Sequence, residues 1–218
     1  MLKFFIFFLT FTAFVACRSV MNNPSSPQYS PIVEIETSLG KIAVQLSSKT
    51  PRHRDNFLKL VKNDFYNNIN FHRIINDFMI QVGDPNARAA DAVYEGEALD
   101  NATIEAEFDS TLFHYRGALC AARMGDQVNP TRASSATQFY IVQAKNVQAQ
   151  QFEQLARYKG YIYTPEQEKM YKSQGGTPHL DREYTVFGQV VEGMDVVDKI
   201  AVSNGQGQVK IMSTKIRK

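Results

Sequence analysis

The alternation of apolar and polar residues after position 31 predicts a fold built mainly from short β-strands. Two β-branched runs, at 32–37 and 41–46, flank a turn at 38–40 and are typical of a β-hairpin. Other apolar runs of strand length lie at 71–75, 78–82, 117–122, 138–142, 185–191 and 209–216. About eight short strands with few helices favour a β-barrel over a parallel α/β fold.

Two segments between these strands have helical spacing instead. Thr50 can cap a helix in which Pro51 takes the first position, and the residues that follow predict an amphipathic helix of about 14 residues. A shorter helix is predicted over 194–200, between the last two strands. The pattern therefore places two helices among the strands.

Two further stretches exceed what a small barrel needs. Residues 86–113 form a polar stretch that we expect to be a loop. Residues 147–177 form an insertion rich in helix formers, in which Thr164-Pro165 begins a second helix and Gly175-Gly176 ends it. This insertion is predicted to be a helical hairpin rather than a disordered loop.

The first 16 residues have the pattern of an export signal. They contain one charged residue, Lys3, followed by an apolar run from Phe4 to Phe14. The run is shorter than the roughly 20 residues that a membrane-spanning helix needs. We therefore expect residues 1–16 to be a signal peptide that is cleaved before Cys17.

The segment Phe14–Cys17 resembles a bacterial lipobox, with Phe14 where leucine is usual. The resemblance implies that Cys17 is lipidated and anchors an exported chain to a bacterial membrane, facing the periplasm. Residues 17–31 then read as the lipidated cysteine and a flexible tether before a domain at 32–218. The alternative is an ordinary secretory signal without lipid attachment.

Composition excludes several other functions. The chain has 24 Lys and Arg against 22 Asp and Glu, so its net charge of +2 does not predict a nucleic-acid partner. Its two cysteines, Cys17 and Cys120, cannot form a disulfide framework. Neither they nor the four histidines have the spacing of a metal site, so no metal is expected. Cys120 lies in an apolar run and is predicted to be a buried packing thiol.

The segment 71–85 contains the most distinctive polar residues. Strand alternation places Arg73 on the face of Phe71 and Ile75. It places Gln81 on the face of Met79. A cation would then share a surface with apolar groups. The alternative is an arginine at a strand end whose stem packs while its guanidinium reaches solvent.

Four sequence blocks decide between these interpretations. They are FHRII at 71–75, FMIQVGDP at 78–85, QFYI at 138–141 and VFGQV at 186–190. In this order and spacing they resemble the cyclophilin family of peptidyl-prolyl cis-trans isomerases, and the resemblance extends over 32–218 apart from the two insertions. It implies a mainly β fold, a closed eight-stranded antiparallel barrel capped by two helices, here with an extra helical insertion.

The resemblance also implies a site for proline-containing polypeptides. Arg73 takes the place of the catalytic arginine, and Gln81 and Gln138 take those of the groups that hold the peptide backbone. The residues that correspond to the proline pocket are Phe78, Met79, Tyr140 and Leu180. Those that correspond to the strand edge beside the substrate are Ala121 and Ala122. Three positions depart from the usual family residues: Ala122 replaces asparagine, His179 replaces tryptophan and Tyr184 replaces histidine.

These residue types suit the isomerisation of X-Pro bonds. The barrier, about 18–20 kcal/mol, comes from amide resonance that is lost as the bond twists. The twisted proline nitrogen gains a lone pair, to which a guanidinium can donate far better than to the planar amide. No covalent bond is made or broken, so neither cofactor nor metal is expected.

Two functions remain open at this point. The first is an isomerase that assists the folding of exported polypeptides in the cell envelope, with the insertion shaping which polypeptides reach Arg73. The alternative is a cyclophilin-like protein-binding module or holdase with little turnover. An insertion that covers Arg73 would favour the alternative.

Overall fold

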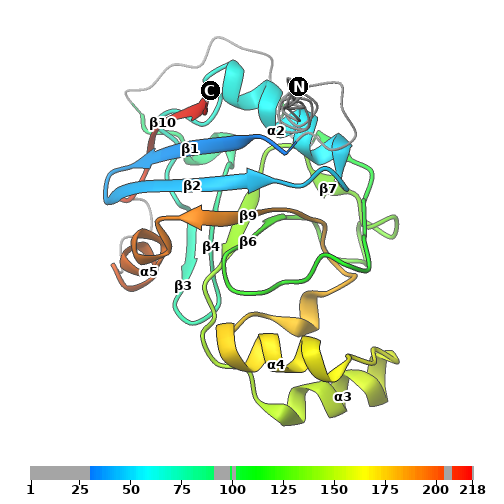
Figure 1. Cartoon of the computed structure of the whole chain (residues 1–218). Coiled ribbons are helices and arrows are strands. Elements are labelled where there is room, and N and C mark those ends of the chain that lie inside the picture. The colour runs from blue at the N-terminus through cyan, green and yellow to red at the C-terminus, as the bar shows by residue number, and fades with distance from the viewer. Residues whose placement is uncertain (1–29, 91–98, 100–101, 204–207, 218) are drawn as a thin grey trace, which may run out of the picture.

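Eight antiparallel strands form one sheet, which supplies the frame of the protein (Figure 1). This computed structural model describes residues 30–90, 99, 102–203 and 208–217, so the predicted signal peptide lies outside the described residues. In sheet order the strands are β10 (Ile211–Ile216), β1 (Ile32–Thr37), β2 (Gly40–Leu46), β9 (Val186–Glu192), β6 (Ala118–Ala121), β8 (Phe139–Val142), β4 (Met79–Val82) and β3 (Arg73–Ile75).

The two edge strands, β10 and β3, are joined through the residues that precede them. The N–H of Asn68 donates to the carbonyl of Ile211 at 2.8 Å, and the N–H of Ile211 donates to Ile69 at 3.0 Å. The N–H of Phe71 donates to the carbonyl of Val209 at 2.8 Å. The predicted mainly β, eight-stranded antiparallel fold is therefore confirmed. Backbone hydrogen bonds between 68–71 and 209–211 connect its two edges.

The inner face of the sheet and two helices enclose the main core. Side chains that point inward along successive strands include Ile80, Leu119, Ile141 and Phe187. Helix α2 (Pro51–Lys62) and helix α5 (Met194–Val202) pack against the sheet. Phe57 of α2 meets the ring of Phe139 edge-on at 5.3 Å. These are the two helices that the sequence predicts.

The start of α2 differs from the sequence prediction. Thr50 occupies the N-cap position, but its hydroxyl makes no capping hydrogen bond. The carboxylate of Glu107 accepts the N–H groups of Arg52 and His53 instead, at 3.1 and 3.0 Å. An acidic side chain at this end also suits the helix dipole. A residue far along the chain thus satisfies the N–H groups that Thr50 was predicted to cap.

The described part of the segment 86–113 contains regular secondary structure. It begins within a short 3-10 helix, η1 (Pro85–Ala87), and includes β5 (Thr103–Ile104). Strand β5 pairs with β7 (Ser134–Ser135) as a second, two-stranded sheet, which the sequence pattern did not predict. Residues 91–98 and 100–101 lie outside the described residues.

The insertion is a helical hairpin, as predicted. Helices α3 (Ala149–Lys159) and α4 (Pro165–Gln174) lie together beyond one end of the barrel, far from α2 (Figure 1). The side chain of Thr164 forms a capping box with Gln167 at the start of α4. Phe152, Tyr171 and Val147 form a separate small core beneath the hairpin. The insertion therefore has packing of its own.

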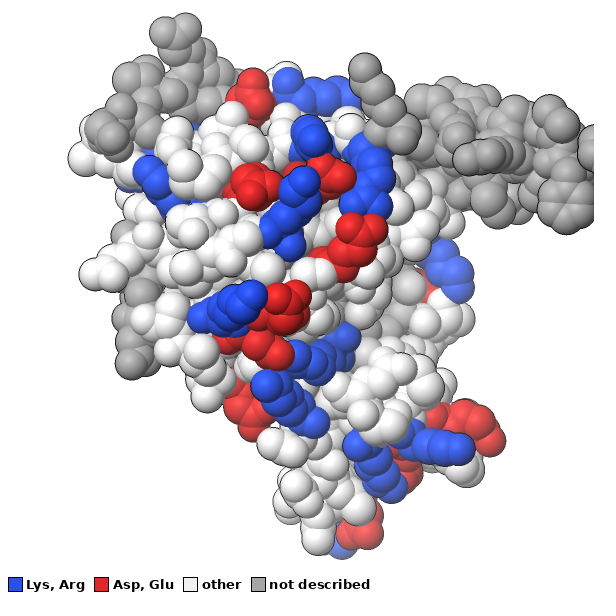
Figure 2. All heavy atoms as spheres, turned by 60° about the vertical axis from the view of Figure 1, so that its left-hand side comes forward, with Lys and Arg blue, Asp and Glu red and all other residues white. Residues whose placement is uncertain are grey.

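Charged side chains of both signs are interspersed on the face that Figure 2 shows. Arg217 binds both oxygens of Glu192, at 2.7 and 2.9 Å, and Glu34 at 3.0 Å. Hydrogen bonds from Lys215 and Arg217 hold the pKa of Glu34 below its ordinary value. No helix in the described part of the chain combines the length and the apolar character needed to cross a bilayer.

Candidate active site

Strand pairing places the two predicted polar residues directly opposite each other. Arg73 of β3 lies across from Gln81 of β4, and Ile75 lies across from Met79. Arg73 and Ile75 are both exposed on the outer face of the barrel. Phe71 is not on this face: it is 1% exposed and belongs to the inner core. The prediction for Phe71 was wrong because β3 begins only at Arg73.

A row of hydrogen-bonded side chains crosses the strands from this pair. A guanidinium nitrogen of Arg73 donates to Oε1 of Gln81 at 3.4 Å. Nε2 of Gln81 donates to Oε1 of Gln138 at 3.0 Å. Gln138 adjoins the start of β8, which pairs with β4. The three predicted polar groups are thus connected, and Arg73 remains exposed.

An apolar pocket wall lies on the same outer face. Met79, Ala122 and Tyr140 belong to one buried cluster, against which Phe78, Leu180 and Tyr184 pack. The 3-10 helix η2 (Pro178–Leu180) brings His179 and Leu180 to this cluster. The structure therefore gathers the predicted pocket residues from four separate parts of the chain.

His179 and Tyr184, two positions that differ from the usual family residues, stack on or meet aromatic rings of this wall. The ring of His179 stacks on Phe78, with centroids 6.0 Å apart and planes 18° apart. The ring of Tyr184 meets Tyr140 edge-on at 5.9 Å. Burial lowers the pKa of His179, which favours a neutral ring against Phe78. Both replacements therefore keep aromatic contacts at the pocket.

The predicted strand edge, at Ala121 and Ala122, is hydrogen-bonded within the protein. The side chain of Ala121 packs in the inner core, so only its backbone can take the predicted place at the strand edge. The N–H of Ala122 donates to Gln138 at 3.0 Å, and its carbonyl accepts from Ser135 at 2.8 Å. Both backbone groups of Ala122 are therefore paired within the protein.

A cavity of about 670 Å³ continues the site beyond the two glutamines. Gln81 and Gln138 line one side, and Arg123, Met124 and Asn129 line another. Sequence reasoning did not find this cavity, because its lining comes from segments far apart in the chain, among them β5 and β7.

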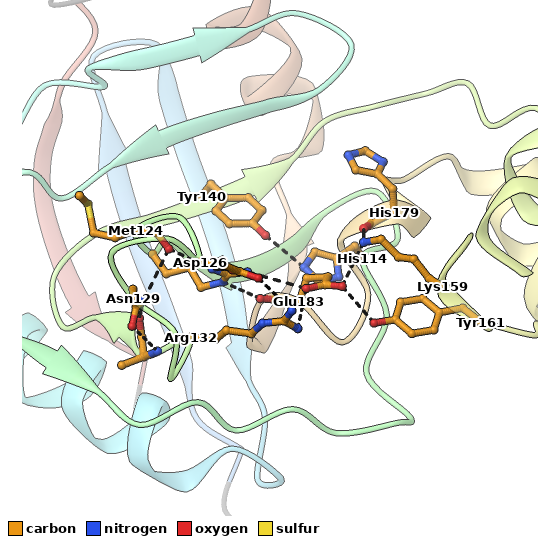
Figure 3. Close-up of polar contacts among 12 residues, drawn as sticks. His114, Met124, Asp126, Asn129, Arg132, Tyr140, Lys159, Tyr161, His179 and Glu183 are labelled. Carbon is orange, nitrogen blue, oxygen red and sulfur yellow. Dashed lines mark hydrogen bonds and ion pairs between the residues drawn. The ribbon is translucent and has the colours of Figure 1, made fainter. Parts of the chain in front are cut away.

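Glu183 ties the pocket segment to two other parts of the protein (Figure 3). Its Oε1 accepts from Nζ of Lys159 and from the hydroxyl of Tyr161, both at 3.0 Å. Its Oε2 lies 2.7 Å from a guanidinium nitrogen of Arg132. The insertion, the loop at 123–132 and the segment that carries His179 therefore meet at one carboxylate.

Cys120 and possible metal ligands are the remaining candidates from the sequence. Cys120 is fully buried under Tyr140, and burial raises the pKa of its thiol well above the ordinary value, so it is a packing residue as predicted. Within the described ranges, no group of three His, Cys, Asp or Glu side chains is arranged to hold a metal ion. Burial likewise raises the pKa of Tyr140, which keeps its hydroxyl protonated.

Comparison with known proteins agrees with this geometry. Residues 32–218 match the family described as "Cyclophilin type peptidyl-prolyl cis-trans isomerase/CLD". A Staphylococcus saprophyticus protein named as a peptidyl-prolyl cis-trans isomerase is 40% identical over 157 residues, which cover 72% of this chain and 73% of the relative. A Staphylococcus aureus protein named in the same way is 38% identical over 170 residues, covering 78% and 80%.

Solved structures show the same fold. A Cryptosporidium parvum cyclophilin type peptidyl-prolyl cis-trans isomerase superposes with a TM-score of 0.61 at 22% identity, covering 87% of this chain and 99% of that one. A second structure of that protein, determined in the presence of the dipeptide Ala-Pro, gives a TM-score of 0.59 at 21% identity, covering 86% and 99%. The chain belongs to the cyclophilin-type peptidyl-prolyl cis-trans isomerases.

Proposed function

We propose that Arg73 is the catalytic residue of this isomerase and that the pocket around Met79 and Tyr140 holds the proline ring. The observation that carries this assignment is the connected row from Arg73 through Gln81 to Gln138 beside the apolar pocket. A proline ring in the pocket would bring its nitrogen to the arginine side of the row. The Ala-Pro dipeptide named for the Cryptosporidium parvum structure supports a proline-containing ligand.

Each part of the site has a separate task in this mechanism. The pocket fixes the proline ring, while Gln81 and Gln138 offer amide groups to the backbone on either side. Arg73 donates to the proline nitrogen once the twisting bond has given it a lone pair. Since Arg73 is exposed, the insertion leaves it accessible, which favours an isomerase over the binding module or holdase.

Phe78 offers the sharpest test of the pocket. Because Phe78 is only half-buried, Phe78→Ala is expected to raise KM for a proline tetrapeptide about tenfold with a modest loss of stability. Met79 is 2% exposed, so Met79→Ala would also cost about 2–5 kcal/mol of stability and would confuse the two effects. A protease-coupled peptide assay measures KM, and an unchanged value for Phe78→Ala would mean that the pocket lies elsewhere.

The site of action is the second part of the proposal. We infer that the isomerase works on exported polypeptides in the cell envelope, anchored to a bacterial membrane by a lipid on Cys17. The apolar run from Phe4 to Phe14, followed directly by this cysteine, supports the inference. Each buried methylene of an acyl chain contributes about 0.8 kcal/mol, so two or more chains would hold the protein firmly.

Lipidation can be tested with the two cysteines of the chain. Cys17→Ala is expected to abolish incorporation of labelled lipid and to move the protein out of the membrane fraction, while the domain from Ile32 stays folded and active. Cys120→Ala is the matched control, because it removes the buried thiol and leaves Cys17 in place. Equal labelling of wild type and Cys17→Ala would show that this cysteine carries no anchor.

The insertion fits a role in the choice of polypeptide. Tyr158 and Ile162 project from it with 79% and 80% of their surface exposed. On the loop at 123–132, which meets the insertion at Glu183, Met124 and Val128 are also strongly exposed. Apolar side chains beside the proline site suit the contacts that an unfolded polypeptide offers. This arrangement supports clients that are incompletely folded.

A further inference from the structure

A buried carboxylate connects the insertion to the barrel. Asp181 follows η2 directly and is 2% exposed. Its Oδ1 accepts the backbone N–H of His114 at 2.8 Å and lies 2.8 Å from Nδ1 of the same residue. Its Oδ2 accepts the hydroxyl of Tyr171 at 2.6 Å, and it shares the hydroxyl of Tyr163 with the carbonyl of Pro178, each at 2.9 Å. Four donors therefore fill the acceptor sites of one carboxylate.

His114 links Asp181 to the pocket residue Tyr140 by hydrogen bonds. The imidazole is fully buried, and its Nε2 lies 3.1 Å from the hydroxyl oxygen of Tyr140 (Figure 3). Since Nδ1 faces Asp181, Nε2 is the ring nitrogen that hydrogen-bonds to the Tyr140 hydroxyl. The two rings lie 18° from parallel, with centroids 6.3 Å apart. The position of Tyr140 is thus set by a residue that Asp181 holds.

The donors to Asp181 come from two different parts of the fold. His114 lies just before β6 of the barrel, whereas Tyr163 and Tyr171 belong to the insertion, one before α4 and one within it. Burial and the nearby Asp181 carboxylate raise the pKa of both tyrosines, which therefore remain protonated donors. A buried carboxylate that loses such donors must find others or shift.

We propose that Tyr163 and Tyr171 are positioning residues for the proline pocket. By holding Asp181 they fix His114, and through His114 they fix the ring of Tyr140 that forms one wall of the pocket. The insertion then supports the binding of proline as well as offering a surface to polypeptides. This proposal rests on the isomerase activity and on the pocket assigned above, and it is independent of membrane anchoring.

The first test removes one hydroxyl and keeps the ring. Tyr171 packs against the rings of Tyr115 and Phe152, at 4.4 and 5.9 Å, and Tyr171→Phe preserves both contacts. The variant is expected to raise KM for a proline tetrapeptide about threefold to tenfold with kcat unchanged, because Tyr140 binds the ring and Arg73 acts on the twisted bond. Lys169→Ala, which alters an exposed residue of the same helix, should keep the KM of wild type.

The second test asks whether the effect passes through Tyr140. Tyr140→Phe removes the hydroxyl at the end of the connection, so adding Tyr171→Phe to it is expected to change KM no further. The proposal is overturned if Tyr171→Phe raises KM equally in both backgrounds, or leaves KM unchanged in the wild-type background. If Tyr171→Phe leaves KM unchanged, Phe78→Ala shows which assignment failed. A raised KM for Phe78→Ala would keep the pocket assignment and reject only the role of the tyrosines.

Discussion

Arg73→Ala is expected to lower kcat/KM for a proline tetrapeptide about 10²- to 10³-fold, as the loss of one donor to a transition state does in other enzymes. The guanidinium donates to a lone pair that exists only while the bond is twisted, so its loss affects kcat more than KM. The fold should survive, because Arg73 is exposed and its bond to Gln81 is long, at 3.4 Å.

Two further variants make this result specific. Arg73→Lys should also lose most activity, because an ammonium does not reproduce the planar fork of guanidinium donors. Arg157→Ala is the matched control: it removes an exposed arginine from α3, away from the polar row, and should leave turnover unchanged. Circular dichroism would verify that each variant is folded. Near-normal catalysis by folded Arg73→Ala would refute the mechanism.

Asp181→Ala is expected to lower the free energy of unfolding by about 3–5 kcal/mol, because each buried donor that loses its acceptor costs about 1–3 kcal/mol. The variant would leave the backbone N–H and Nδ1 of His114 and the hydroxyl of Tyr171 without their acceptor, whereas the hydroxyl of Tyr163 keeps the carbonyl of Pro178. Buried donors without acceptors carry the full cost of their desolvation. Urea unfolding, followed by circular dichroism, measures the change.

An acidic residue on the surface provides the comparison. Asp195 pairs with Lys199 one turn along α5, and both side chains are largely exposed. Exposed pairs of this kind contribute little to stability. Asp195→Ala should therefore unfold close to the wild-type urea concentration. If Asp181→Ala unfolded there too, the buried carboxylate would have no part in holding the insertion to the barrel.

The strands were predictable because they depend on local spacing, whereas the family resemblance supplied the residues of the polar row. Alternation placed Ile75 on the face of Arg73 and Met79 on the face of Gln81, and β3 and β4 pair in that register. The same reasoning failed at Phe71, because it assumed that the strand continues for two residues before Arg73. The chain instead bonds there to Val209, and no local pattern shows that partner.

The polar connections behind the pocket were beyond the reach of sequence patterns. Asp181 and His114 are separated by 67 positions, and each alone is compatible with an ordinary surface residue. Glu183 and Glu107 likewise bind groups distant in sequence, at the insertion and at the start of α2. The family resemblance predicted the pocket residues, since it extends over whole sequence blocks. It did not extend to an insertion that the family pattern lacks.

The pairing of β1 with β10 has a consequence for the order in which this protein can fold. Val33, near the start of the domain, lies opposite Ile216, near its end. When the chain is synthesised from its N-terminus, β1 can pair with β2 early. It can pair with β10 only after β10 has been made. Contacts that span nearly the whole domain are slow to form, because the loop between them must first be closed. Before β10 pairs with it, the outer edge of β1 has unpaired backbone groups that other chains could bind. Strand β10 therefore also protects the protein from aggregation.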